Sequence, residues 1–175
     1  MENNVNIRPV EPADAQGLLN LFQRLDRETD FMLLEPEERN INQENQTQLL
    51  EQFIRTERNI YLVAEFNQTI VGFIVGTCSR FTRNRHVMSV VVGVMRERWG
   101  QGIGRRLIVE CERLAVSREI HRLELTVMQD NLAAIHLYLK AGFMVEGVKR
   151  HSMKVNGIWR DEYLMSKLMS PTLGV

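Results

Sequence analysis

The feature that most constrains this chain is a glycine-rich segment between a run of β-branched residues and a helical pattern. It extends from Arg96 to Arg106 and reads RERWGQGIGRR. Glycine has no Cβ, so its backbone can approach a ligand closely and turn its amide hydrogens toward it. The helix that follows adds unpaired amides and the positive end of its dipole. A strand that enters a helix in this way predicts a site for a phosphate or pyrophosphate.

The glycine spacing excludes two common nucleotide-binding motifs. A dinucleotide fingerprint of the form Gly-x-Gly-x-x-Gly would need glycine at position 105, where this chain has arginine. No Gly-Lys-Ser/Thr sequence follows, so the segment is not a P-loop. For the segment taken alone, the alternative is a tight strand–helix turn with glycines kept for packing and arginines that are merely solvated.

Length and charge limit the class of protein. The chain has 175 residues, of which 44% are hydrophobic and 25% charged, as in ordinary globular proteins. We therefore expect one domain over residues 1–175, with its core between residues 5 and 168. Lysine plus arginine equals aspartate plus glutamate at 22 each, which argues against a nucleic-acid or membrane-surface binder.

Neither a targeting segment nor a membrane span is expected. The first residues, MENN, show no basic region followed by an apolar run, and no apolar stretch approaches the ~20 residues of a membrane helix. We expect a cytoplasmic protein. Cys78 and Cys111 fit small buried hydrophobes in a reducing compartment. Nothing near either cysteine is placed to activate it as a nucleophile.

Hydrophobic periodicity predicts a mixed α/β domain. Strands are expected at residues 5–8, 60–66, 69–78, 86–95, 122–127, 143–155 and 158–168. Helices are expected near residues 11–25, 49–54, 107–115 and 131–140. In the last helix Leu132, Ile135 and Leu139 are expected to face inward. Asn67-Gln68 and Asn156-Gly157 suit hairpin turns, and Ala141-Gly142 suits a helix end.

Several motifs in this order resemble one family. After the glycine segment come Asn131, Ala134 and Tyr138 in an Asn-x-x-Ala-x-x-x-Tyr pattern, and then Gly142-Phe143. Together they resemble the GCN5-related N-acetyltransferases (GNAT family), and the resemblance covers nearly the whole chain. One departure is Trp99, where the family pattern has arginine or glutamine. The resemblance implies the GNAT acyl-CoA N-acyltransferase fold, a central, mostly antiparallel, splayed sheet flanked by helices.

The resemblance implies acetyl-CoA as cosubstrate and no metal. The pyrophosphate would lie on the amides of the glycine segment, and the pantetheine arm beside the preceding strand, where the sheet splays. Arg98, Arg105 and Arg106 are candidates to neutralise phosphates, and the alternative for Asn131 is a helix N-cap. The expected cofactor-binding residues are Val92, Gly93, Val94, Arg98, Gly100, Gln101, Gly102, Ile103, Gly104, Arg105 and Asn131.

Tyr138 is the expected catalytic acid. It follows Asn131 by seven residues, about two helical turns, so both project from one face of a helix. Acyl transfer from a thioester to an amine expels a thiolate, which a phenol can protonate as it leaves. The alternative is an ordinary core tyrosine. His136 lies on another face and is expected to be exposed.

The base is less strongly indicated. Many GNAT relatives have glutamate at the place of Thr126, and threonine is no base at neutral pH. Glu124 lies two residues earlier on the same strand face and is the candidate base. The alternatives are a solvated or ion-paired Glu124, with a chain of water and backbone carbonyls taking the proton.

The acceptor is expected to be a primary amine. The wall around it is expected from the loop at residues 26–38, the strand at residues 86–95 and the final hairpin. Glu28 and Asp30 could hold an ammonium beside Phe31, with Asp161 and Glu162 on the last strand as further candidates; each acid could instead be a solvated surface group. The resemblance is to bacterial GNAT enzymes acting on small molecules, amino acids or protein N-termini by direct transfer in a ternary complex. The alternative is a non-catalytic CoA-binding regulatory domain. The last hairpin offers strand edges for a homodimer.

Overall fold

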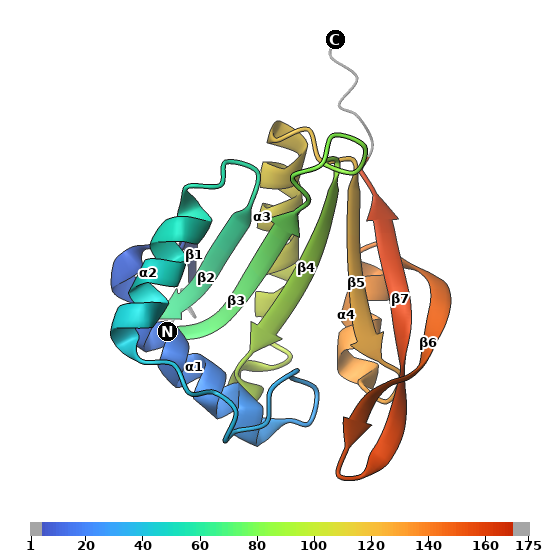
Figure 1. Cartoon of the computed structure of the whole chain (residues 1–175), viewed down its shortest axis with the longest axis horizontal. Helices are drawn as coiled ribbons and strands as arrows, with labels where there is room; N and C mark the ends of the chain where they lie inside the picture. The colour runs from blue at the N-terminus through green and yellow to red at the C-terminus, as the bar shows by residue number, and fades with distance from the viewer. Residues whose placement is uncertain (1–4, 170–175) are drawn as a thin grey trace.

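A seven-stranded sheet organises the computed structural model, which describes residues 5–169 (Figure 1). The strands are β1 (Asn6–Pro9), β2 (Ile60–Phe66), β3 (Thr69–Cys78), β4 (Val87–Val94), β5 (Arg122–Met128), β6 (Met144–Val155) and β7 (Ile158–Leu168). Their order across the sheet is β1-β2-β3-β4-β5-β7-β6. All neighbouring strands are antiparallel except β4 and β5. The predicted fold class is therefore confirmed. The first residues, MENN, whose sequence argued against a signal peptide, lie outside the described residues.

Four α-helices flank this sheet in the described residues. They are α1 (Ala15–Glu28), α2 (Gln43–Ile54), α3 (Ile103–Ser117) and α4 (Leu132–Lys140). Helices α1 and α2 lie on one face of the half that ends at β4, while α3 and α4 lie behind the sheet (Figure 1). The core fills the space between them with fully buried side chains such as Leu18, Ile74 and Leu107. Within residues 5–169, no helix is long and apolar enough to cross a membrane.

Two tight turns set the register of the outer strands. Asn67 and Gln68 have φ of 48° and 62°, and Asn156 and Gly157 have φ of 49° and 78°. Two successive left-handed residues form the kind of turn whose twist matches the right-handed twist of a hairpin. The flanking residues pair accordingly, Phe66 with Thr69 and Val155 with Ile158. Both hairpins predicted from the sequence are confirmed.

The two central strands part after a short paired stretch. β4 and β5 pair only at Val87–Arg122, Met88–Leu123 and Ser89–Glu124. Beyond Ser89, β4 remains paired with β3 on its other edge, as far as Gly72–Val94. The strands diverge toward the glycine segment (Figure 1), leaving strand edges that an extended ligand can pair with. This is the splayed sheet that the family resemblance implied.

The inward face of α4 was predicted only in part. Ile135 packs against the core as predicted, but Leu132 and Leu139 are 73% and 50% exposed, whereas Tyr138 is 6% exposed. The buried side of the helix also contains Ala134, four residues before Tyr138. Leu132 and Leu139 suggested a different face, but α4 is short and tertiary packing decided its rotation. His136 is exposed, as predicted.

Candidate active site

Gly100 and Gly102 form an open cradle before α3. Their φ angles are +74° and +77°, in the left-handed region that only glycine adopts without strain. A Cβ built on either would have no heavy atom within 4 Å, so the space beside both is clear. Gly102 is also the N-cap of α3 and offers no side chain to its unpaired amides. The cradle therefore fits an anionic group that approaches the backbone.

Gly104 has a different role from its two neighbours. A Cβ at this position would lie 2.9 Å from Cδ2 of Leu137, on α4. The first turn of α3 thus packs directly against α4, the helix that carries Tyr138. Gly104 is therefore needed for helix packing. Gly100 and Gly102 are needed for their left-handed backbone and for the clear space beside them.

Trp99 explains the departure from the family pattern. Its indole Nε1 donates a hydrogen bond of 2.7 Å to the carbonyl oxygen of Val94, at the end of β4. A short 3₁₀ turn over Arg96–Arg98 lies between these two residues. Trp99 therefore fastens the start of the cradle to the strand end with its side chain. The Val94 carbonyl is already bonded in this way.

The arginines around the cradle have separate environments. The guanidinium of Arg98 stacks over the Phe66 ring, with Cζ 3.9 Å from its centroid, and Arg106 donates to the carbonyl of Val5 at 2.8 Å. Arg105 is exposed on the first turn of α3 and forms no ion pair within residues 5–169. Of the predicted phosphate-binding arginines, Arg98 and Arg105 form no side-chain hydrogen bond or ion pair within the described residues, and the buried Nε of Arg98 has no hydrogen-bond partner there. Both keep their donors for a phosphate.

Asn131 and Tyr138 share the inner face of α4. Asn131 Oδ1 accepts a hydrogen bond from the Ala134 amide at 3.2 Å, so its side chain is an N-cap. The Tyr138 ring lies 5.8 Å from that of Phe143. Burial raises the pKa of Tyr138 to about 12, because the phenolate would lose its hydration. The group is therefore protonated at neutral pH and can act only as a donor of a proton.

Glu124 belongs to an ion-pair network at the closed end of the strand opening. Its carboxylate binds Nε of Arg122 at 3.0 Å and lies at the level of Ser89, where β4 and β5 are still paired. Arg122 also binds Glu146, which accepts a hydrogen bond from Ser166 at 2.6 Å. These two donors lower the pKa of Glu146 to about 2. Glu124 was expected to be a base, a solvated group or an ion-paired one, and the structure shows the ion pair.

A pocket of about 270 Å³ lies where the predicted acceptor residues gather. Four segments supply its lining: the residues after α1 (Glu28, Thr29, Asp30, Phe31), the segment before the cradle (Arg96, Trp99), the end of β5 (Met128, Asp130) and the last hairpin (Val155, Arg160). The predicted residues Glu28, Asp30 and Phe31 thus come together. The last hairpin was expected to contribute to this wall, but it does so through Val155 and Arg160 and not through the residues named from the sequence. Met128 and Asp130, at the end of β5, were not predicted, because no local motif marks them. Asp161 and Glu162 do not line this pocket.

Glu28 is occupied by bonds to the protein. It accepts a hydrogen bond from the backbone amide of Arg96 at 2.9 Å and forms an ion pair with Arg24, which also binds Glu97 at 2.7 Å. Burial by itself would raise the pKa of Glu28, but these hydrogen bonds outweigh it and lower the pKa. Glu28 therefore ties the end of α1 to the segment before the cradle.

A buried ion pair holds the loop between α1 and α2. The carboxylate of Asp26 is fully buried and binds Nε of Arg39 at 2.5 Å. The Arg39 guanidinium also lies over the Phe22 ring, 4.6 Å from its centroid. Because residues 29–31 of this loop line the pocket, the ion pair helps to place the acceptor wall.

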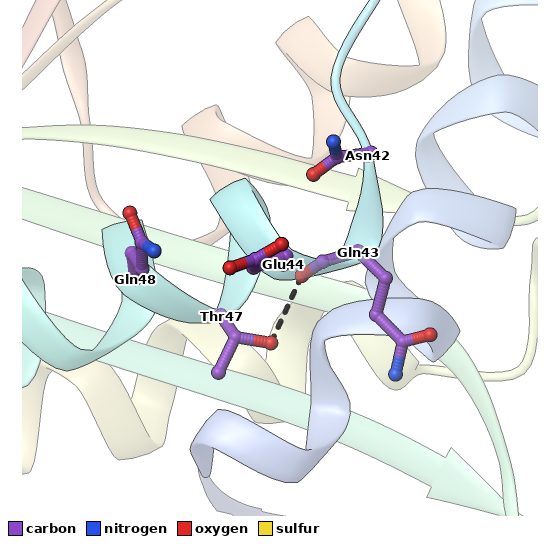
Figure 2. Close-up of a pocket in the computed structure, with 5 residues that line it drawn as sticks. All are labelled: Asn42, Gln43, Glu44, Thr47 and Gln48. Atoms are coloured by element: carbon purple, nitrogen blue, oxygen red, sulfur yellow. Dashed lines mark hydrogen bonds between the residues drawn. The ribbon is translucent and has the colours of Figure 1, made fainter.

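A larger hollow of about 520 Å³ lies elsewhere, at the first turns of α2. Figure 2 shows its lining, Asn42, Gln43, Glu44, Thr47 and Gln48, all of it polar and all from one segment. Thr47 donates to the Gln43 carbonyl at 2.9 Å, and Asn42 caps the helix. Both bonds are to the backbone of the first turns of α2. We therefore assign the site to the smaller pocket beside the cradle.

The cysteines lie outside this pocket. Cys111 is fully buried in α3, and burial raises its pKa to about 12. Burial likewise raises the pKa of the half-buried Cys78. The thiolate is the nucleophilic form, so both thiols are poor nucleophiles at neutral pH.

Comparison with known proteins agrees with this geometry. Residues 21–143 match the sequence model of the Acetyltransferase (GNAT) family. The chain belongs to the GNAT family. It is 26% identical to the probable N-acetyltransferase YjcK of Bacillus subtilis, over 94% of this chain and 93% of that protein.

Two solved structures show the extent of the likeness. The GNAT acetyltransferase of Streptococcus pneumoniae is 32% identical, with a TM-score of 0.90 over 95% of this chain and 100% of that chain. YncA of Salmonella typhimurium, a putative acetyltransferase solved with its cofactor acetyl-CoA, shares the fold at 21% identity, with a TM-score of 0.85 over 98% of both chains. This GNAT protein is thus an acetyl-CoA-dependent acetyltransferase.

Proposed function

We propose that this GNAT protein transfers the acetyl group of acetyl-CoA directly to the primary amine of a small molecule, amino acid or peptide in a ternary complex. The observation that carries the proposal is that Trp99 belongs to both sites. It immediately precedes Gly100 of the cradle and also lines the pocket, together with Met128 at the diverging end of β5. Donor and acceptor sites therefore adjoin at the strand opening.

The residues around the cradle are proposed to hold the donor. The backbone from Gly100 through Gln101, Gly102, Ile103 and Gly104 to Arg105 would bind the pyrophosphate, with the Arg105 guanidinium adding charge. The strand edge at Val92 and Gly93 would pair with the pantetheine arm. Asn131 would act by capping α4 and so placing Tyr138.

Tyr138 is proposed to complete the transfer. The amine nitrogen forms a bond to the acetyl carbon while the carbon–sulfur bond breaks and the sulfur leaves with the electron pair. Tyr138 donates its proton to that sulfur, since its pKa of about 12 keeps the phenol protonated until a strong base forms beside it. The acetylated amine loses its extra proton to the base.

Two routes for that last proton are proposed, and the structure supports them unequally. Glu124 could accept it only by loosening its 3.0 Å ion pair with Arg122. Water bonded to backbone carbonyls along the strand opening needs no such change. The ion pair therefore favours the water route.

Direct transfer is also supported by the state of the cysteines. A covalent acetyl-enzyme route needs a reactive nucleophile next to the donor. This chain has two cysteines, and burial raises the pKa of both thiols. Neither lines the pocket.

Initial-rate kinetics test the proposal. CoA release is measured with a thiol reagent over a panel of amino acids, polyamines, aminoglycosides and peptides, varying both substrates for any amine that is turned over. Intersecting double-reciprocal lines are expected for a ternary complex. Parallel lines would indicate an acetyl-enzyme. Acetyl-CoA binding with no turnover of any amine would instead favour a regulatory CoA-binding domain.

A further inference from the structure

The charges of the acceptor pocket pair unevenly. Glu28 is bonded to Arg24, and Asp130 forms an ion pair with Arg160 at 3.3 Å. Arg96 and Asp30 also line the pocket, and neither enters an ion pair within the part of the chain that the structure describes. The charge of Arg96 helps to lower the pKa of Glu28, but the Arg96 guanidinium and the Asp30 carboxylate form no ion pair within the described residues and keep their hydrogen-bonding groups for a ligand. This balance matches a zwitterion better than a polyamine, which would need several free carboxylates.

The Arg96 backbone and its guanidinium each have a neighbour at the pocket. The backbone amide donates to Glu28 at 2.9 Å, and the guanidinium lies 5.9 Å from the centroid of the Trp99 ring, at the outer range of a cation–π contact. Trp99 is itself fastened to Val94. A guanidinium fork binds a carboxylate through two parallel hydrogen bonds, and a pre-oriented fork loses less entropy in doing so.

The size and walls of the pocket limit the rest of the ligand. Its volume of about 270 Å³ is below the range of roughly 300–1,000 Å³ typical of sites for drug-sized ligands. Phe31, Trp99, Met128 and Val155 supply apolar wall from all four segments. A long chain would exceed this volume, whereas a short apolar side chain fits it and matches these four walls.

We infer that the acceptor is a small α-amino acid with an apolar side chain, whose carboxylate binds Arg96. Asp30 attracts the ammonium as it enters, and Phe31 and Trp99 contact the side chain. This inference rests on the proposed acetyl transfer and names its substrate class. It also separates a free amino acid from a peptide N-terminus, which has no α-carboxylate to place on Arg96.

Three matched acceptors test the inference: L-leucine, L-leucinamide and 3-methylbutylamine. They share the side chain but only leucine carries a carboxylate. The factor by which Arg96→Gln lowers kcat/KM is measured for each, so differences in amine basicity cancel. We expect a loss of about 10- to 100-fold for leucine, mainly through KM, because a charge-assisted pair is removed. For the other two acceptors we expect a loss below about 3-fold.

Arg27→Gln is the matched control. Arg27 is an exposed arginine on α1 that does not line the pocket, so its loss changes net charge equally and should leave all three rates unchanged. An equal fall in kcat/KM for the three acceptors in Arg96→Gln would overturn the inference. So would a wild-type enzyme that acetylates leucinamide but not leucine. Either result leaves acetyl transfer intact. If acetyl-CoA binds but none of the amines in the wider panel reacts, the proposed function fails and the inference fails with it.

Discussion

The cradle proposed for the donor and the pocket proposed for the acceptor adjoin, yet they are built in opposite ways. The cradle is one contiguous run from Gly100 to Arg105, and it offers backbone amides beside two glycines with φ near +75°. The pocket draws side chains from four segments that extend from Glu28 to Arg160. Backbone recognition of this kind suits a donor common to a whole family. Side-chain recognition lets the acceptor differ from one member to another.

The same contrast appears in how each site is held. The start of the cradle is fastened by the bond from Trp99 to Val94, five residues away, and its end by the bond from Arg106 to the Val5 carbonyl. The pocket depends on long-range ion pairs, such as Arg39 with Asp26 and Arg24 with Glu97. Changes in the cradle should therefore affect donor binding, while changes in the ion pairs should affect the acceptor.

The largest effect is expected from Gly102→Val. A β-branched residue at φ of +77° is strained, and its methyl groups would occupy the clear space beside the amides. Strain of about 1–2 kcal/mol and the loss of a charge-assisted hydrogen bond together predict a rise of about 1,000-fold in the Kd of acetyl-CoA, measured by calorimetry.

Gly147→Val is the control for this change. Gly147 lies in β6, outside the left-handed region, and a Cβ there meets nothing within 4 Å. Its acetyl-CoA affinity should equal that of the wild type. A folded Gly102→Val protein with unchanged affinity would show that the cradle does not bind the donor.

Tyr138→Phe should lower kcat by about 100-fold and leave the Kd of acetyl-CoA within about 2-fold, because only the proton donor is lost. Since burial raises the pKa of Tyr138 to about 12, the wild-type rate should show no alkaline limb from this group below about pH 10. Single-turnover rates from pH 6 to 10 measure both effects.

The matched control for Tyr138 is Tyr61→Phe. Tyr61 is a largely buried tyrosine on β2 that packs against Phe53 and Phe73, outside the site, and burial raises its pKa as well. Its kcat should not change. Unchanged turnover in Tyr138→Phe would remove the acid assignment.

Asp26→Asn should separate the two sites. It leaves the Arg39 guanidinium without its buried counter-charge, which should cost about 1–3 kcal/mol in the free energy of unfolding, measured in urea. The acceptor KM should rise about 10-fold through the displaced loop, with acetyl-CoA affinity unchanged. The control is Glu110→Gln, which breaks the exposed pair Glu110–Arg113. It should change neither the free energy of unfolding nor the acceptor KM. If Asp26→Asn weakened acetyl-CoA binding as much as acceptor binding, the two sites would not be independent.

Glu124→Gln should have the smallest effect, a fall in kcat of less than about 5-fold, because the lost ion pair is partly exposed. Glu146→Gln removes the other carboxylate from Arg122 and should behave alike. A fall of 100-fold or more in Glu124→Gln alone would identify Glu124 as the base and exclude the water route.

Local patterns predicted most of the fold. β2 and β3 have the predicted bounds, since alternating apolar residues end at the turn pair Asn67-Gln68. α2 is longer than its apolar residues indicated, because Asn42 caps a polar first turn. The rotation of α4 was predicted only in part, since exposed leucines gave it a misleading stripe.

The candidate site was predicted in part. Glu28, Asp30 and Phe31 were placed correctly beside the pocket by their position after the first helix. Met128, Asp130, Val155 and Arg160 carry no local signal, because their proximity depends on how β5 and the last hairpin approach α1. The bonds that occupy Glu28 and Glu124 could not be read from the chain either, since each involves partners on other elements.

The sequence by itself determined the strands, the hairpins and the open glycine turn before α3, because these depend on residues adjacent in the chain. A left-handed position favours glycine whatever surrounds it. Only the tertiary structure decided which glycine serves packing, which arginines beside the cradle keep their donors and which charged side chains of the pocket form no ion pair. Those properties arise from contacts between segments up to about 130 residues apart, and burial and pairing are set by such contacts.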